Sequence, residues 1–98
     1  MLLQPGVDIS RLARPIRRVL CPLDSLFDKY KEELVITSTY GGNHLPCSLH
    51  YANLAIDIRL PKQNLREIVT EIKDILGKDY DVVLERDHIH IEYDPKGD

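Results

Sequence analysis

Hydrophobic residues recur every three or four positions between residues 64 and 77, and this spacing predicts an amphipathic helix. The apolar stripe consists of Leu65, Ile68, Val69, Ile72, Ile75 and Leu76. Asn64 is followed three residues later by Glu67, which is typical of a capping box, and Gly77 is a natural helix end. A second, shorter helix is predicted from Asp24, a candidate N-cap, to about residue 32.

Two further stretches have the pattern of strands rather than helices. Residues 34–40 are rich in β-branched residues and stop at two glycines, which predicts a strand followed by a loop over residues 41–54. Residues 55–60 alternate between apolar and polar side chains. Because successive side chains of a strand point to opposite faces, Asp57 is expected on the face opposite Ile56 and Ile58.

A hairpin is predicted near the end of the sequence. Residues 80–85 and 88–93 alternate in the same way and are separated only by Arg86 and Asp87. A two-residue turn places Glu85 directly opposite His88, with His90 on the same face. Arg-Asp is a poor sequence for the preferred turn type, so a longer turn with Asp87 as the carboxylate nearest the histidines stays open.

These elements predict one small α+β domain over residues 23–94, with helices packed on one face of an antiparallel sheet and a polar site on the other. Residues 1–22 are expected to form an N-terminal arm or short helical lead-in, because three prolines interrupt them. Their four arginines favour a solvated face, with a basic patch for an anionic polymer as the alternative. Residues 95–98 are a polar tail.

Composition narrows the class of protein. The chain has 98 residues, of which 43% are hydrophobic and 30% charged, so it holds one soluble domain. A net charge of −3 gives no general attraction to nucleic acid. No apolar run has the length of a signal peptide or membrane span, so we expect synthesis in a reducing cytoplasm. Cys21 and Cys47 form no CxxC pair, and whether they pair with each other stays open.

Three of the four histidines and two carboxylates are expected on the polar face of the sheet. A catalytic zinc ion typically takes three His or carboxylate ligands, and His50, Asp57 and His90 are the candidates. Glu85 is then placed to act as general base, and His88 to hydrogen-bond the developing oxyanion. A His-x-His pair alone also arises by chance on a solvated sheet face, so the prediction depends on the whole set. His44 and Cys47 are expected to be loop or packing residues.

The same residues resemble a known zinc-site signature. Ser48, His50, Ala55 and Asp57, followed by Glu85 and the His88–His90 pair, are similar to the pattern S-x-H-x-x-G-x-A-x-D … E/D … H-x-H. This pattern belongs to the D-Ala-D-Ala carboxypeptidases and L-alanyl-D-glutamate endopeptidases, which share the hedgehog/DD-peptidase fold. The resemblance covers residues 34–93. It implies zinc ligands at His50, Asp57 and His90, a catalytic carboxylate at Glu85 and a transition-state-stabilising histidine at His88.

One position and one segment depart from the family pattern. Asn53 replaces the usual glycine, and residues 37–41 lack the arginine that many peptidase members use near the substrate carboxylate. Small phage-encoded members of this group degrade peptidoglycan. The resemblance therefore implies a monomeric phage endolysin that is made in the host cytoplasm and acts on cell-wall peptides, at lysis or as part of the virion.

Two other functions compete with the peptidase. A non-catalytic, zinc-stabilised binding module of hedgehog type would keep the metal without hydrolysis, although a structural site would be expected to fill all four zinc positions with protein ligands. A metallohydrolase of another fold could also use a His-x-His pair. Ser48 and Ala55, in register with the rest of the motif, argue against it.

Overall fold

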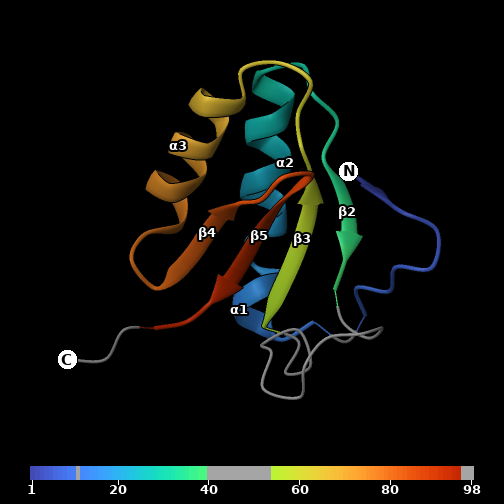
Figure 1. The fold of residues 1–98 in the computed structure, drawn as a ribbon. Coiled ribbons are helices and arrows are strands. Elements are labelled where there is room, and N and C mark those ends of the chain that lie inside the picture. Colours follow the sequence, from blue (N-terminus) through green and yellow to red (C-terminus); the bar gives the residue numbers. More distant parts are fainter. Residues whose placement is uncertain (11, 40–53, 96–98) are drawn as a thin grey trace.

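The computed structural model describes residues 1–10, 12–39 and 54–95 (Figure 1). Along the chain the elements are β1 (Leu2–Leu3), α1 (Arg14–Arg17), α2 (Leu20–Lys29), β2 (Val35–Ser38), β3 (Ala55–Arg59), α3 (Leu65–Leu76), β4 (Tyr80–Leu84) and β5 (His88–Tyr93). Most of the predicted loop, with His44, Cys47 and His50, lies outside the described residues. So do Arg11 and most of the polar tail.

The five strands form one mixed sheet in the order β1-β2-β3-β5-β4. β2, β3, β5 and β4 pair antiparallel, as the sequence predicts, whereas β1 runs parallel to β2. The prediction of a wholly antiparallel sheet is therefore wrong at this edge. β1 is only two residues long, and the backbone N–H of Leu2 and of Gln4 donate to the carbonyls of Leu34 and Ile36. Such a short edge strand leaves no alternating pattern to detect.

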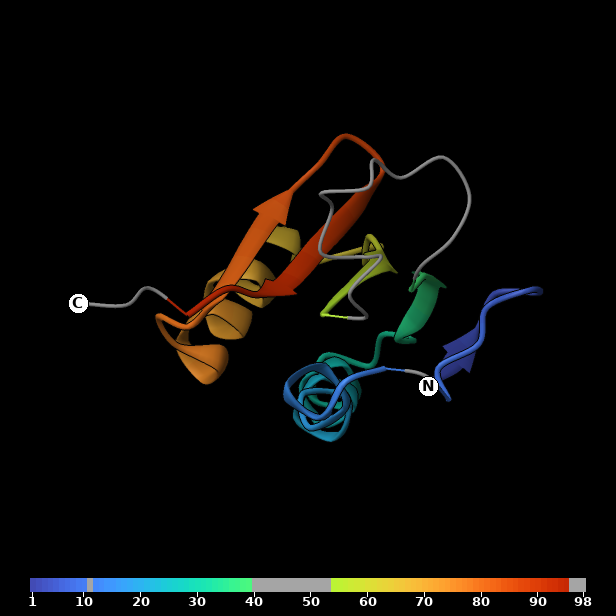
Figure 2. The same cartoon turned by 90° about the horizontal axis from the view of Figure 1, so that it is seen from below.

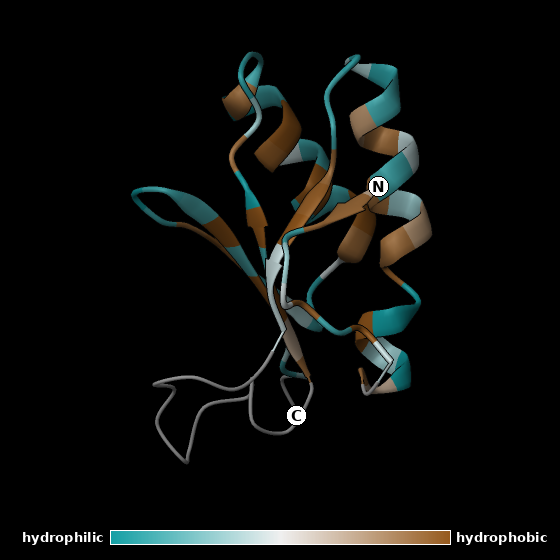
Figure 3. Ribbon diagram, turned by 90° about the vertical axis from the view of Figure 1, so that its right-hand side faces the viewer, coloured by the Kyte–Doolittle hydropathy of each residue, from teal (hydrophilic) through white to brown (hydrophobic). Residues whose placement is uncertain are grey.

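The main helices α2 and α3 cover the same face of the sheet (Figure 2). The opposite face, called the open face here, is covered by no helix of the described residues. The core lies between these two layers. From the sheet it takes Ile36, Ile56, Ile58, Ile89 and Ile91, and from the helices Leu23, Phe27, Ile68 and Ile72, all fully buried. In Figure 3 hydrophobic segments run along the strands and along parts of both helices. The arrangement confirms a compact α+β domain with its apolar sheet face against helices.

The α3 helix matches its predicted range closely. It begins after Asn64 and ends at Gly77, whose φ of +78° is a conformation that glycine adopts without strain. The predicted capping box is wrong, however. Asn64 is itself left-handed, with φ of +61°, and its side chain makes no capping hydrogen bond.

The α2 helix begins at Leu20, four residues before the predicted N-cap Asp24. Pro22 falls in its first turn, where the missing N–H has no helical partner to lose. Leu20 and Leu23 are buried, so the extra turn packs against the core.

Residues 1–22 belong to the folded domain rather than to a separate arm. They supply four buried residues to the core: Leu12, Ile16, Val19 and Leu20. The expected helical lead-in is α1, with Pro15 in its first turn. Arg14, Arg17 and Arg18 are exposed, as predicted for a solvated face. None of the described helices combines the length and hydrophobicity needed to cross a membrane.

Candidate functional site

The β4–β5 hairpin has the predicted register. The N–H of Glu85 donates to the carbonyl of His88 at 2.9 Å, so these two residues face each other across a turn of Arg86 and Asp87. Further along, Val83 is paired with His90. Because Ile89 and Ile91 are buried against the helices, alternation leaves His88 and His90 on the open face.

The β3 strand brings Asp57 onto the same face. It pairs antiparallel with β5, and Asp57 is the direct partner of His90, while Arg59 is the partner of His88. Ile56 and Ile58 are fully buried, which fixes the orientation of the strand. Three side chains of the predicted set, Asp57, His88 and His90, are therefore gathered by the pairing of two strands.

Both ring nitrogens of His90 contact carboxylates. Nδ1 lies 2.8 Å from Oδ1 of Asp57, and Nε2 lies 2.7 Å from Oε1 of Glu92. The hydrogen bond to Asp57 raises the pKa of His90, against an opposing effect of burial, and Glu92 adds to the increase. Since ionised carboxylates only accept hydrogen bonds, this geometry favours the doubly protonated form of the imidazole. A metal ion binding to His90 must displace one of these protons.

The imidazole of His88 also lies near Asp57. Its Nε2 is 3.7 Å from Oδ1 of Asp57, and its Nδ1 is 2.7 Å from Oδ1 of Asp87. The hydrogen bond from His88 lowers the pKa of Asp87. Two imidazoles thus lie within 4 Å of Oδ1 of Asp57, whose side chain is only 13% exposed, whereas that of Asp87 is 85% exposed.

A shallow depression adjoins these groups. It is lined by Gln4, Thr37, Asp57, Arg59, Asp87 and His88. Glu85, the predicted base, is not among the lining residues. The alternation over residues 55–60 also puts Arg59 on the face of Asp57, but Arg59 was not predicted to be a site residue. No local sequence pattern predicts Gln4 at the site, because Gln4 reaches it through the pairing of β1 with β2, which is distant in the sequence.

The described residues fit part of a zinc site. A carboxylate and an imidazole in contact, Asp57 and His90, are ligand types that zinc takes in catalytic centres. His50, the predicted third ligand, lies outside the described residues.

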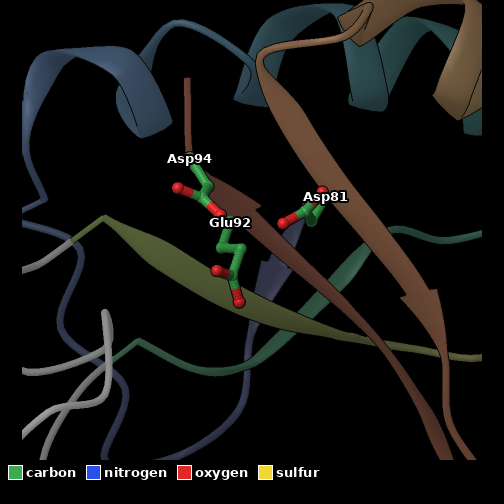
Figure 4. Close-up of side chains that lie close together, drawn as sticks. All are labelled: Asp81, Glu92 and Asp94. Atoms are coloured by element: carbon green, nitrogen blue, oxygen red, sulfur yellow. The ribbon is translucent and has the colours of Figure 1, made fainter. Parts of the chain in front are cut away.

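A different acidic group, Asp81, Glu92 and Asp94, brings carboxylate oxygens within 4.8 Å of one another (Figure 4). It comprises oxygen donors alone on a partly exposed surface and is not evidence for zinc.

Comparisons with known proteins add no family. No protein-family model matches the chain, and no curated protein matches it.

Proposed function

We propose that this protein is a zinc-dependent peptidase of the hedgehog/DD-peptidase-like fold that hydrolyses peptide bonds of bacterial peptidoglycan. The observation that supports it best is the contact between Asp57 and His90, with His88 beside them, on an open sheet face. These residues occupy the positions that the signature assigns to two zinc ligands and to the histidine that stabilises the transition state.

The zinc site would use His50, Asp57 and His90. When bound, zinc acts as a Lewis acid and lowers the pKa of its water towards about 7. Glu92 already holds the second ring nitrogen of His90 at 2.7 Å. Carboxylates in this position commonly orient a ligating histidine and increase its basicity, so Glu92 is a positioning residue of the proposed site.

The remaining residues handle the proton and the developing charge. A carboxylate base takes a proton from the attacking water and returns it to the leaving amine. The sequence assigns this role to Glu85, with Asp87 as the alternative. We favour Asp87, because it lines the depression and contacts His88. The His88 ring, held by Asp87, is placed to donate a hydrogen bond to the oxyanion.

The substrate and setting follow from the resemblance alone. They are stem or cross-bridge peptides of the cell wall, acted on by a monomeric phage enzyme that is made in the host cytoplasm. Neither nucleic acid nor a membrane is a proposed partner.

The test combines metal content with cleavage. Wild type, Asp57→Asn and the control Asp81→Asn, a carboxylate substitution on the same sheet face, are assayed for bound zinc and for release of amino groups from purified peptidoglycan. We expect about one zinc per chain and cleavage in wild type and in the control, and loss of both in Asp57→Asn. If wild type binds zinc but does not cleave peptidoglycan, the non-catalytic, zinc-stabilised binding module is favoured over the peptidase. Absence of both would refute the proposal.

A further inference from the structure

The β4 strand forms an exposed edge of the sheet. It is the last strand in the order β1-β2-β3-β5-β4, and no described strand lies beyond it (Figure 1). Val83 and Leu84 are 42% and 47% exposed. Edge strands are usually protected by a proline, a lysine, a bulge or a covering segment. The five residues of β4 include neither proline nor lysine and pair with β5 without a bulge, so this edge is open to a further strand.

The backbone of β4 offers hydrogen-bonding groups to such a strand. The N–H of Glu85 donates to the carbonyl of His88. Because bonded residues alternate along an antiparallel ladder, every second residue of β4 before Glu85 also bonds β5. Val82 and Leu84, which lie between them, therefore direct their N–H and C=O groups away from β5. No described residue forms a hydrogen bond with these groups.

The open face of this edge is acidic. Asp81 and Glu85 lie on it, with the exposed Val83 between them. Glu92, the partner of Asp81 on β5, and Asp94 bring their carboxylate oxygens within 4.8 Å of that of Asp81 (Figure 4). Opposite charges on facing residues of neighbouring strands stabilise a sheet, so this edge favours a strand with cationic side chains.

The same charges oppose pairing of β4 with a second copy of itself. A two-fold axis normal to the sheet keeps each side chain on its own face. With the axis at Val83, Asp81 is opposite Glu85 of the second copy. With the axis at Val82, Asp79 is opposite Glu85, and with the axis at Asp81 that carboxylate is opposite its own copy. Since like charges directly opposite each other are destabilising, the strand that fits this edge has a different, basic sequence.

We propose that the β4 edge binds an extended, basic segment of a partner protein as an additional antiparallel strand. The segment bonds to the backbone of Val82 and Leu84 through two apolar residues, and it places lysine or arginine opposite Asp81 and Glu85. In strand addition of this kind, main-chain hydrogen bonds supply affinity and alternate side chains supply specificity. The inference is independent of the proposed peptidase function.

The experiment uses the peptide acetyl-Lys-Val-Thr-Val-Lys-amide as the probe. It is titrated into the full chain, and binding is followed through the backbone amide NMR signals. In the proposed alignment the N–H groups of both valines bond to β4, whereas that of the threonine points away. A peptide with both valines N-methylated therefore removes the bonds, and a peptide with only the threonine N-methylated is the matched control. A third peptide has glutamate in place of both lysines.

We expect the signals of Val82 and Leu84 to change most. Methylation of the valines should weaken binding by roughly 10-fold or more, the effect of losing two hydrogen bonds, and methylation of the threonine should change it little. The glutamate peptide should bind more weakly than the lysine peptide. Equal effects of the two methylations, equal binding of the lysine and glutamate peptides, or signal changes away from β4 would overturn the inference.

A charge swap tests the register. Asp81→Lys should weaken binding of the lysine peptide roughly 2- to 5-fold, and glutamate at the facing peptide position should restore it. Asp74→Lys, which makes the same charge change on the exposed surface of α3, is the control and should do neither. Equal effects of the two substitutions would overturn the proposed alignment. Self-association of the free chain through β4, measured by analytical ultracentrifugation and NMR, would also overturn it, because a second copy would then occupy the edge.

Discussion

Asp57 and His90 are direct partners on neighbouring antiparallel strands, and Oδ1 of Asp57 lies 2.8 Å from Nδ1 of His90. The two residues are 33 positions apart in the sequence, and the segment between them includes the α3 helix and the β4 strand. The contact therefore exists only when β5 is inserted between β3 and β4. It joins the two described members of the proposed zinc site.

Glu92→Gln is expected to weaken zinc binding without abolishing it. The substitution keeps the shape of the side chain but removes the charge that holds Nε2 of His90. Loss of such an orienting partner typically lowers metal affinity by about 10- to 100-fold. Competition with a zinc chelator measures the change. Asp81→Asn, at the position paired with Glu92 on β4, is the matched control, and an equal effect there would indicate a general charge effect.

Asp87→Asn and Glu85→Gln separate the two candidate bases. Removal of a general base costs about 10²- to 10⁴-fold in rate, and we expect that loss in Asp87→Asn, with a much smaller one in Glu85→Gln. The measurement is kcat on a soluble peptidoglycan peptide, at equal zinc content. A larger loss in Glu85→Gln would return the role to the residue that the family signature assigns.

Ile16→Ala tests whether the N-terminal segment is part of the folded core. Ile16 is fully buried, and truncation of a buried isoleucine costs about 2–5 kcal/mol of unfolding free energy. Urea unfolding followed by circular dichroism measures this value. Ile75→Ala is the control, because the Ile75 side chain is already 47% exposed. We expect it to change the unfolding free energy by no more than roughly 0.5 kcal/mol. Equal effects of the two substitutions would argue against the observed packing of α1.

Stability should depend on pH through Glu71 on α3. Its carboxylate accepts hydrogen bonds from Lys29 Nζ at 2.6 Å and from the Tyr30 hydroxyl, and the bond from Lys29, then that from Tyr30, lowers the pKa of Glu71 below its ordinary value of 4.5. A carboxyl with a lowered pKa in the folded state stabilises the fold above its unfolded-state pKa. That contribution is lost as the pH falls from about 4.5 through the folded-state value.

Wild type should therefore exceed Glu71→Gln in stability at neutral pH, and the difference should shrink in acid. Thermal unfolding of both proteins between neutral and acidic pH checks this. Glu67→Gln, one turn earlier on the same helix, is the control and should show a smaller pH-dependent difference, because Glu67 has no ion pair with a described residue. A constant difference across the pH range would contradict the proposed role of the Glu71 contacts.

Local periodicity was enough to predict much of the architecture. The α3 helix, the β4–β5 hairpin and the face that carries Asp57, His88 and His90 follow from spacing within short segments, because the buried side of each segment must be apolar. The prediction failed for the start of α2 and for the Asn64 cap. At these places the packing of Leu20 and the left-handed backbone of Asn64 decided the outcome.

The sequence by itself thus determined which side chains share the open face of the sheet. Only the tertiary structure decided that β5 lies between β3 and β4, that β1 adds a parallel edge with Gln4 beside the site, and that Glu92 contacts the second nitrogen of His90. It also decided that Arg59 pairs with His88 across β3 and β5. Alternation is a property of a few consecutive residues, whereas strand order and side-chain contacts arise from the burial of apolar surface across the whole chain.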